Sequence, residues 1–174
     1  MKSAWLKSRF ALLYAMLVAC VVLPGCDWLG KSSSQSGSAA AQPTNERLLL
    51  VNVLDKAAYD DAHIKGSIQV PFEELEHWAT TIENKTVPVV VYCANYMCSA
   101  SSDAVKTLQA AGFKNVSAFE GGIAEWKHLG FPVEGPATLP FLDDYQKPEG
   151  YAPAADIKVI NAQELKQLLD AATR

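Results

Sequence analysis

The sequence predicts an α/β fold whose sheet is mainly parallel. Residues 47–55 (RLLLVNVLD) and 87–93 (VPVVVYC) are apolar runs in which polar and apolar residues do not alternate. Strands with this pattern are buried on both faces, as they are in a parallel sheet covered by helices. Segments with helical periodicity alternate with the strands along the chain, and this order is typical of α/β domains.

Two short elements are predicted between these runs. Residues 67–71 (SIQVP) form a strand that ends at a proline. Residues 72–82 form a helix, because Leu75, Trp78 and Ile82 recur at spacings of three and four.

A longer amphipathic helix is predicted over residues 100–113. Its apolar face carries Ala104, Val105, Leu108 and Ala111. Ser99 or Ser101 can cap its start, and Gly112 fits the position after its end. An extended segment, residues 115–122, and a short helix, residues 121–131, come next.

The last part of the chain has a different composition. Residues 136–156 are rich in proline and glycine and are predicted to wrap around the domain as a loop. Residues 157–174 read as a strand followed by an amphipathic helix with an apolar stripe of Leu165, Leu168 and Leu169. Asn161 is placed to cap that helix.

The N-terminus is predicted to be a leader, not part of the fold. Lys2, Lys7 and Arg9 precede the apolar residues 10–25, which are too short for a comfortable membrane span. Leu23-Pro24-Gly25-Cys26 resembles the lipobox of bacterial lipoproteins. The alternatives are an uncleaved membrane anchor and a secretory signal cut elsewhere.

The lipobox resemblance implies that residues 1–25 are removed and that Cys26 carries lipid on its thiol and its new amino group. Several acyl chains make a stable membrane anchor. Asp27 resembles the signal that retains enterobacterial lipoproteins at the inner membrane, so the expected location is the cell envelope, facing the periplasm. Residues 26–46 are rich in serine and alanine and are expected to form a flexible tether.

Composition excludes other classes of function. The net charge is −4 and no block of lysine or arginine stands out, so nucleic acid binding is not expected. The three histidines show no metal-ligand spacing, and neither a metal nor a cofactor is expected.

Two cysteines remain after the leader and the lipid site, and their placement predicts a nucleophile. Cys93 ends the second apolar run, and a short loop leads through Cys98 directly into a helix. Loop amides and a helix start favour an anion, so the thiol of Cys93 is expected to ionise easily. A thiolate is the reactive form of cysteine.

Residues 48–134 resemble a rhodanese domain. The segment LLVNVLDKAAYDDAHIKGSIQVP, including the turn His63-Ile64-Lys65-Gly66, is similar to the family's first half. The segment VVVYCANYMCSASSDAVKTLQAAGFKNVSAFEGGIAEWKHLGFPVEG is similar to its catalytic strand, loop and helix. The resemblance implies a five-stranded parallel sheet flanked by helices, over residues 47–135.

The resemblance also implies a function. Cys93 would accept a sulfane sulfur as a persulfide from a small donor and pass it to a thiol or cyanide acceptor. The loop that surrounds this persulfide, and whose amides would stabilise its charge, comprises residues Ala94, Asn95, Tyr96, Met97, Cys98 and Ser99. Cys98 stands where many members have arginine, and Asn52 where most have aspartate, so a donor less charged than thiosulfate is expected.

Other interpretations remain open at this point. The chain could be an inactive rhodanese-like module that binds a partner or carries sulfur, or a thiol–disulfide oxidoreductase that uses Cys93 and Cys98. Cys98 could resolve a Cys93 persulfide, form a protective disulfide, or simply be a small residue. His63 is expected to hold its turn, Trp126 to lie in the core, and Gly121 with Gly122 to allow a tight turn beside the loop.

The C-terminal strand and helix suggest a permuted domain. Residues 157–174 resemble the strand and helix that normally begin a rhodanese domain, and nothing equivalent precedes Leu48. The hypothesis is a circular permutation in which residues 157–160 close the sheet edge beside residues 116–119. The alternatives are the stub of a second domain and a swap between two molecules.

Overall fold

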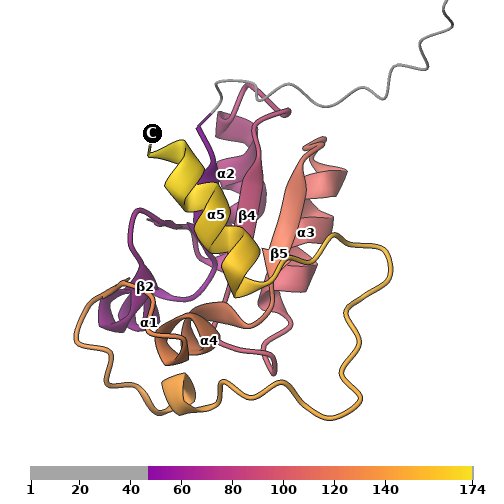
Figure 1. Cartoon of the computed structure of the whole chain (residues 1–174). Helices are drawn as coiled ribbons and strands as arrows, with labels where there is room; N and C mark the ends of the chain where they lie inside the picture. Colours follow the sequence, from indigo (N-terminus) through magenta and orange to yellow (C-terminus); the bar gives the residue numbers. More distant parts are fainter. Residues whose placement is uncertain (1–46, 174) are drawn as a thin grey trace, which may run out of the picture. The chain divides into compact units, whose positions relative to one another are not determined.

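The computed structural model describes residues 47–173 (Figure 1). Its main sheet has four parallel strands in the order β3-β1-β4-β5, namely Ile68–Gln69, Leu49–Asn52, Val89–Tyr92 and Val116–Phe119. The predicted α/β class and parallel sheet are therefore confirmed. The predicted leader, Cys26 and tether lie outside the described residues.

Both faces of this sheet are buried, which explains the apolar runs without alternation. In β4, Val89 and Val91 belong to the same core as residues of the two helices α2 and α3, which are Leu75–Thr81 and Ala100–Ala110. Val90 and Tyr92 point into a second core. Helices α4 and α5, Gly122–His128 and Ala162–Ala172, cover that opposite face.

Several elements differ from the sequence-based expectations. The helix predicted over residues 72–82 is a 3₁₀ turn, η1 (Phe72–Glu74), that continues into α2. Helix α1 (Lys56–Asp61) was not predicted, although Asp55 caps it by accepting from the Ala58 amide at 2.9 Å. A small antiparallel pair, β2 (His63–Ile64) with β6 (Val133–Glu134), was also missed.

Helix ends follow the expected pattern only in part. Gly112 follows α3 with a φ of +95°, as its place after the helix predicts. Ser99 stands at the start of α3 but its side chain makes no capping bond. Asn161 caps α5, and Glu164 completes a reciprocal capping box with it.

The C-terminal segment reaches the free edge of β5. Val159 forms a single parallel bridge with Ala118. The Ala118 amide donates to the carbonyl of Lys158, and the Ile160 amide donates to that of Ala118, each at 2.9 Å. A fifth position in the sheet is therefore occupied by one bridge, not by a regular strand.

The long connection to α5 runs around the periphery of the domain (Figure 1). It follows β6 and contains one 3₁₀ turn, η2 (Pro140–Asp143), whose Leu142 is buried against the core beneath α4. None of the helices within residues 47–173 combines the length and the apolar character that crossing a membrane requires.

Candidate active site around Cys93

Cys93 lies directly after β4, at the carboxyl end of the sheet. Ligands of parallel α/β sheets bind at this end. Two amides at the start of α4 hold the main chain there: Ile123 donates to the carbonyl of Cys93 at 3.1 Å, and Ala124 donates to that of Ala94 at 3.0 Å. The start of the loop is thus fixed by backbone groups of a different element.

Gly122 makes this approach possible. Its φ is +60°, and a Cβ atom built on it would lie 2.5 Å from the carbonyl oxygen of Ala94 and 2.6 Å from that of Cys93. Any side chain would overlap the backbone of the loop. The sequence-based expectation of a tight turn beside the loop therefore has a specific cause at this residue.

Asn95 holds the middle of the loop. Its Oδ1 accepts from the Met97 amide at 3.0 Å, and its carbonyl accepts from the Cys98 amide at 3.1 Å. Its Nδ2 donates to the carbonyl of Phe141 in η2 at 3.2 Å. Asn95 is buried, whereas Met97 at the tip of the loop is 77% exposed.

The two thiols of the site are both free, and they are in different environments. Cys93 is fully buried, and its Sγ–H donates to the carbonyl of Cys98 at 3.1 Å. The hydroxyl oxygen of Ser101 lies 3.4 Å from the same sulfur. Cys98 is only half-buried and interacts with the amides of Ala94 and Ala100.

The ionisation of the pair differs from the sequence-based expectation. A hydrogen bond with Cys98 and burial raise the pKa of Cys93 well above its ordinary value. The hydrogen bond with Cys93, helped by the amides of Ala94 and Ala100, lowers the pKa of Cys98 to about 6. The pair shares one negative charge, and the charge resides on the less buried sulfur because burial disfavours ions.

A hollow of about 530 Å³ opens beside the loop. Its lining is mainly apolar and comprises Leu54, Asp55, Ala57, Ala58, Ala94, Asn95, Met97, Cys98, Leu139 and Phe141. Cys98 contributes to the lining and Cys93 does not. Among these lining residues, which all belong to the described part of the chain, only Asp55 is charged. The lining therefore has no cationic side chain to balance the charge of a dianionic ligand.

Asp61 fixes one wall of the hollow. Its carboxylate accepts from the amide and hydroxyl of Thr138, at 3.0 and 2.7 Å, and from the Leu139 amide at 3.0 Å. The Thr138 hydroxyl is the main cause that lowers the pKa of Asp61. Since Leu139 lines the hollow, this carboxylate positions a chain segment that belongs to the site.

A second contact between the loop and the peripheral connection was not predicted. The ring of Tyr96 meets the ring of Tyr151 edge to face, with centroids 5.2 Å apart. The Tyr151 hydroxyl donates to Glu120, which also accepts from Ser102 in α3. Glu120 is a buried carboxylate directly after β5, and a charged residue at the end of an apolar strand was the signal that could have found it.

Lys147 brings a positive charge near Tyr96. Its Nζ lies 5.9 Å from the Tyr96 ring centroid and 5.0 Å from that of Tyr151. It borders a smaller hollow of about 230 Å³, which also contains Glu120 and Glu164. The carboxylates of this second hollow make it unsuited to an anionic sulfur donor.

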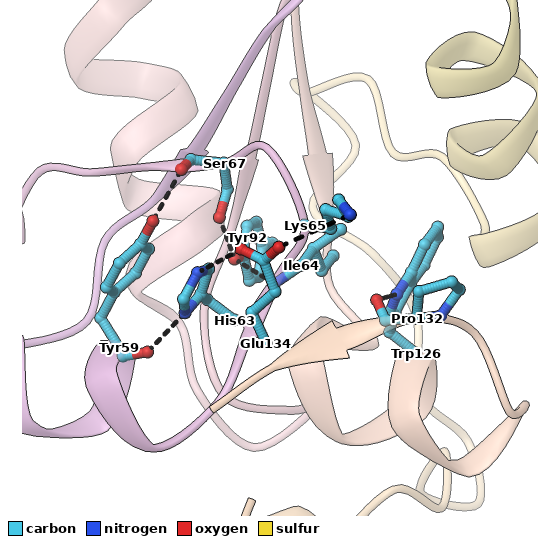
Figure 2. Close-up of polar contacts among 9 residues, drawn as sticks. All are labelled: Tyr59, His63, Ile64, Lys65, Ser67, Tyr92, Trp126, Pro132 and Glu134. Carbon is cyan, nitrogen blue, oxygen red and sulfur yellow. Dashed lines mark hydrogen bonds and ion pairs between the residues drawn. The ribbon is translucent and has the colours of Figure 1, made fainter. Parts of the chain in front are cut away.

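His63 holds its turn, as expected from the sequence (Figure 2). Its Nδ1 bonds to the carbonyl of Tyr59 at 2.8 Å, its Nε2 lies 3.2 Å from Glu134, and its ring stacks on Tyr59. The Tyr92 hydroxyl accepts from the Ile64 amide at 3.0 Å and bonds to Ser67 at 2.8 Å. Burial raises the pKa of Tyr92 to about 12, so it stays a neutral member of this network.

Trp126 lies in the core, as predicted. Its side chain is 2% exposed, and its indole N–H donates to the carbonyl of Pro132 at 2.9 Å (Figure 2). Of the residues between 47 and 173, no three histidine, cysteine or acidic side chains are grouped closely enough to hold a metal ion.

Comparison with known proteins identifies relatives. The chain is 29% identical over 124 residues to the HTH-type transcriptional regulator Rv0324 of Mycobacterium tuberculosis, covering 70% of this chain and 54% of that protein. It thus spans about half the length of that relative. It is 26% identical over 91 residues to the thiosulfate sulfurtransferase GlpE of Tolumonas auensis, covering 52% and 83% of the two chains.

Among solved structures, a rhodanese-like domain of the Alr3790 protein from Anabaena is 37% identical, covers 50% of this chain and 98% of its own, and has a TM-score of 0.46. Residues 36–129, more than half of the chain, match the family of the Rhodanese-like domain. The chain belongs to the rhodanese-like domain family.

Proposed function

We propose that this protein is a rhodanese-type sulfurtransferase in which Cys93 carries the transferred sulfur as a persulfide. The observation that carries the proposal is the placement of Cys93 at the carboxyl end of β4, under a loop whose first two carbonyls are held by α4. Relatives that include a thiosulfate sulfurtransferase support the same class of reaction.

The chemistry has two displacements. In the first, sulfur of the enzyme attacks the terminal sulfur of a donor persulfide, R–S–SH, and R–S⁻ leaves with its electron pair. In the second, an acceptor thiol or cyanide attacks the terminal sulfur of the enzyme persulfide, and the cysteine sulfur leaves. No net oxidant or reductant is required.

The hollow favours a donor of low charge. Its lining is mainly apolar, it contains Asp55, and no cationic residue of the described chain borders it. Thiosulfate, a dianion, would enter it without a compensating charge, at a large desolvation cost. A low-molecular-weight persulfide fits better, because its organic part can lie against Leu139 and Phe141.

Sulfur uptake tests the proposal. The full chain in detergent, with Cys98→Ser, should gain the mass of one sulfur atom on the peptide of residues 86–106 after long exposure to cysteine persulfide. The double variant Cys93→Ser/Cys98→Ser should gain none on that peptide. If neither the wild-type chain nor the Cys98→Ser variant gains sulfur at the end point while its fold is intact, the sulfurtransferase proposal fails.

A thiol–disulfide oxidoreductase is the second candidate, because two free thiols interact directly with each other. In that case the wild-type chain exposed to a persulfide would close a Cys93–Cys98 disulfide and release sulfide instead of keeping the sulfur. A purely binding module would show neither product. Mass analysis of the same peptide separates these outcomes.

The proposal includes a lipid anchor at Cys26 that holds the domain to the inner membrane, facing the periplasm. The support is the lipobox-like Leu23-Pro24-Gly25-Cys26 and the aspartate that follows it. In cells given labelled palmitate, the wild-type chain and Cys20→Ser should both take up label, and Cys26→Ser should not. Label that persists in Cys26→Ser would contradict the anchor.

The proposal also includes the circular permutation. The support is the single parallel bridge between Val159 and Ala118, which places residues 158–160 beside the free edge of β5. Burial of Ile160 and Leu165 in the core shared with Tyr92 and Phe119 adds the helix that accompanies such a strand.

A further inference from the structure

The two thiols differ in their access to the hollow. Cys93 has no exposed surface, and it does not border the hollow of about 530 Å³. Cys98 is half-buried and forms part of the wall. A donor that enters the hollow therefore meets Cys98 on its wall, whereas Cys93 lies behind the wall.

The two residues also contact each other directly. The thiol of Cys93 donates to the carbonyl of Cys98, and the two side chains share a hydrogen bond. The thiol of Cys93 therefore lies against the residue that carries the second thiol, within one short loop, as a transfer between the two requires.

We infer that Cys98 takes the sulfane sulfur from the donor and passes it inward to Cys93. This inference rests on the proposed sulfurtransferase function and adds an entry thiol to it.

The electrostatics support this order of events. The lowered pKa of Cys98, about 6, makes its sulfur the ionised and nucleophilic one near neutral pH. The raised pKa of Cys93 keeps its thiol protonated until the Cys98 thiolate has reacted with the donor. Amides of Ala94 and Ala100, at the two ends of the loop, stabilise the outer anion.

Atoms and electrons balance in both steps. The Cys98 thiolate attacks the terminal sulfur of R–S–SH and becomes Cys98–S–SH, while R–S⁻ leaves. Cys93 then attacks the terminal sulfur of Cys98–S–SH. The Cys93 proton passes to the leaving Cys98 sulfur, and the products are Cys93–S–SH and Cys98–SH.

The test compares three forms of the full chain in detergent: wild type, Cys93→Ser and Cys98→Ser. Each is mixed with cysteine persulfide, and the reaction is stopped with an alkylating reagent at increasing times. Cleavage after Lys85 and after Lys106 releases the peptide of residues 86–106, which contains both thiols. Fragmentation of this peptide between positions 93 and 98 locates the added sulfur.

The relay predicts a distinct pattern. Wild type should carry sulfur first on Cys98 and later on Cys93. Cys93→Ser should still take up sulfur and should keep it on Cys98. Cys98→Ser should reach the same end point on Cys93 at least about tenfold more slowly, because the remaining thiol is buried and protonated.

Two results would overturn the relay while leaving the sulfurtransferase function intact. One is loading of Cys98→Ser at the wild-type rate, and the other is the absence of sulfur on Cys93→Ser. A Cys93–Cys98 disulfide with free sulfide in the wild type would also overturn it, and would favour the oxidoreductase. No uptake by any form would instead remove the proposed function itself.

Discussion

Replacing Gly122 with alanine should lower the free energy of unfolding by about 2–5 kcal/mol. This loss combines the steric overlap of the new Cβ atom with the loop and the strain of a left-handed backbone conformation. The new Cβ atom would lie 2.5 Å from the carbonyl oxygen of Ala94, and the φ of this residue is +60°. Relief would require α4 to move away from the loop. The amides of Ile123 and Ala124 would then release the carbonyls that they hold.

Gly130, two residues after the C-terminal end of α4, offers a matched control. Its φ is +73°, but a Cβ atom there would meet nothing within 4 Å. Gly130→Ala should therefore cost only the backbone strain, about 1 kcal/mol. Urea unfolding of both variants measures the difference. Equal losses in the two variants would show that the contact with the loop contributes nothing.

Replacing Leu165 with alanine should destabilise the domain by about 2–5 kcal/mol, as is usual for a buried leucine. Its side chain is fully buried in α5, in the same core as Tyr92, Phe119 and Trp126. The truncation would leave a cavity between α5 and the sheet. Because α5 follows the bridge at Val159, this loss would also measure how firmly the C-terminal segment is docked.

Leu168 is the control on the same helix. It is 43% exposed, so Leu168→Ala should change stability by no more than about 0.5 kcal/mol. Thermal unfolding of the two variants and of a chain lacking residues 156–174 gives the comparison. Deletion should be the most severe change, because it also exposes the edge of β5. A deletion that left the melting temperature unchanged would refute the permutation.

Prediction from sequence succeeded where a local pattern reflects a repeated physical constraint. The runs around Val51 and Val91 were identified as parallel strands because burial on both faces removes alternation. Asn161 was identified as a cap because its side chain bonds only to nearby amides. The place of Cys93 at a strand end followed from the same reasoning.

Features that depend on distant segments could not be predicted in this way. The pairing of His63 with Glu134 joins residues that are 71 positions apart, and each partner strand has only two residues. The contact between Glu120 and Tyr151 depends on the path of a long peripheral connection. The raised pKa of Cys93 depends on the position of the Cys98 side chain and on burial, which spacing alone does not fix.

The bridge between Val159 and Ala118 has a consequence for synthesis on the ribosome. Chains emerge from the N-terminal side, so β5 is available long before the segment that pairs with its edge. Until Leu165 emerges, the apolar surface around Phe119 lacks its cover. The nascent domain should remain susceptible to proteases until residues 157–172 have emerged, and then acquire resistance in one step.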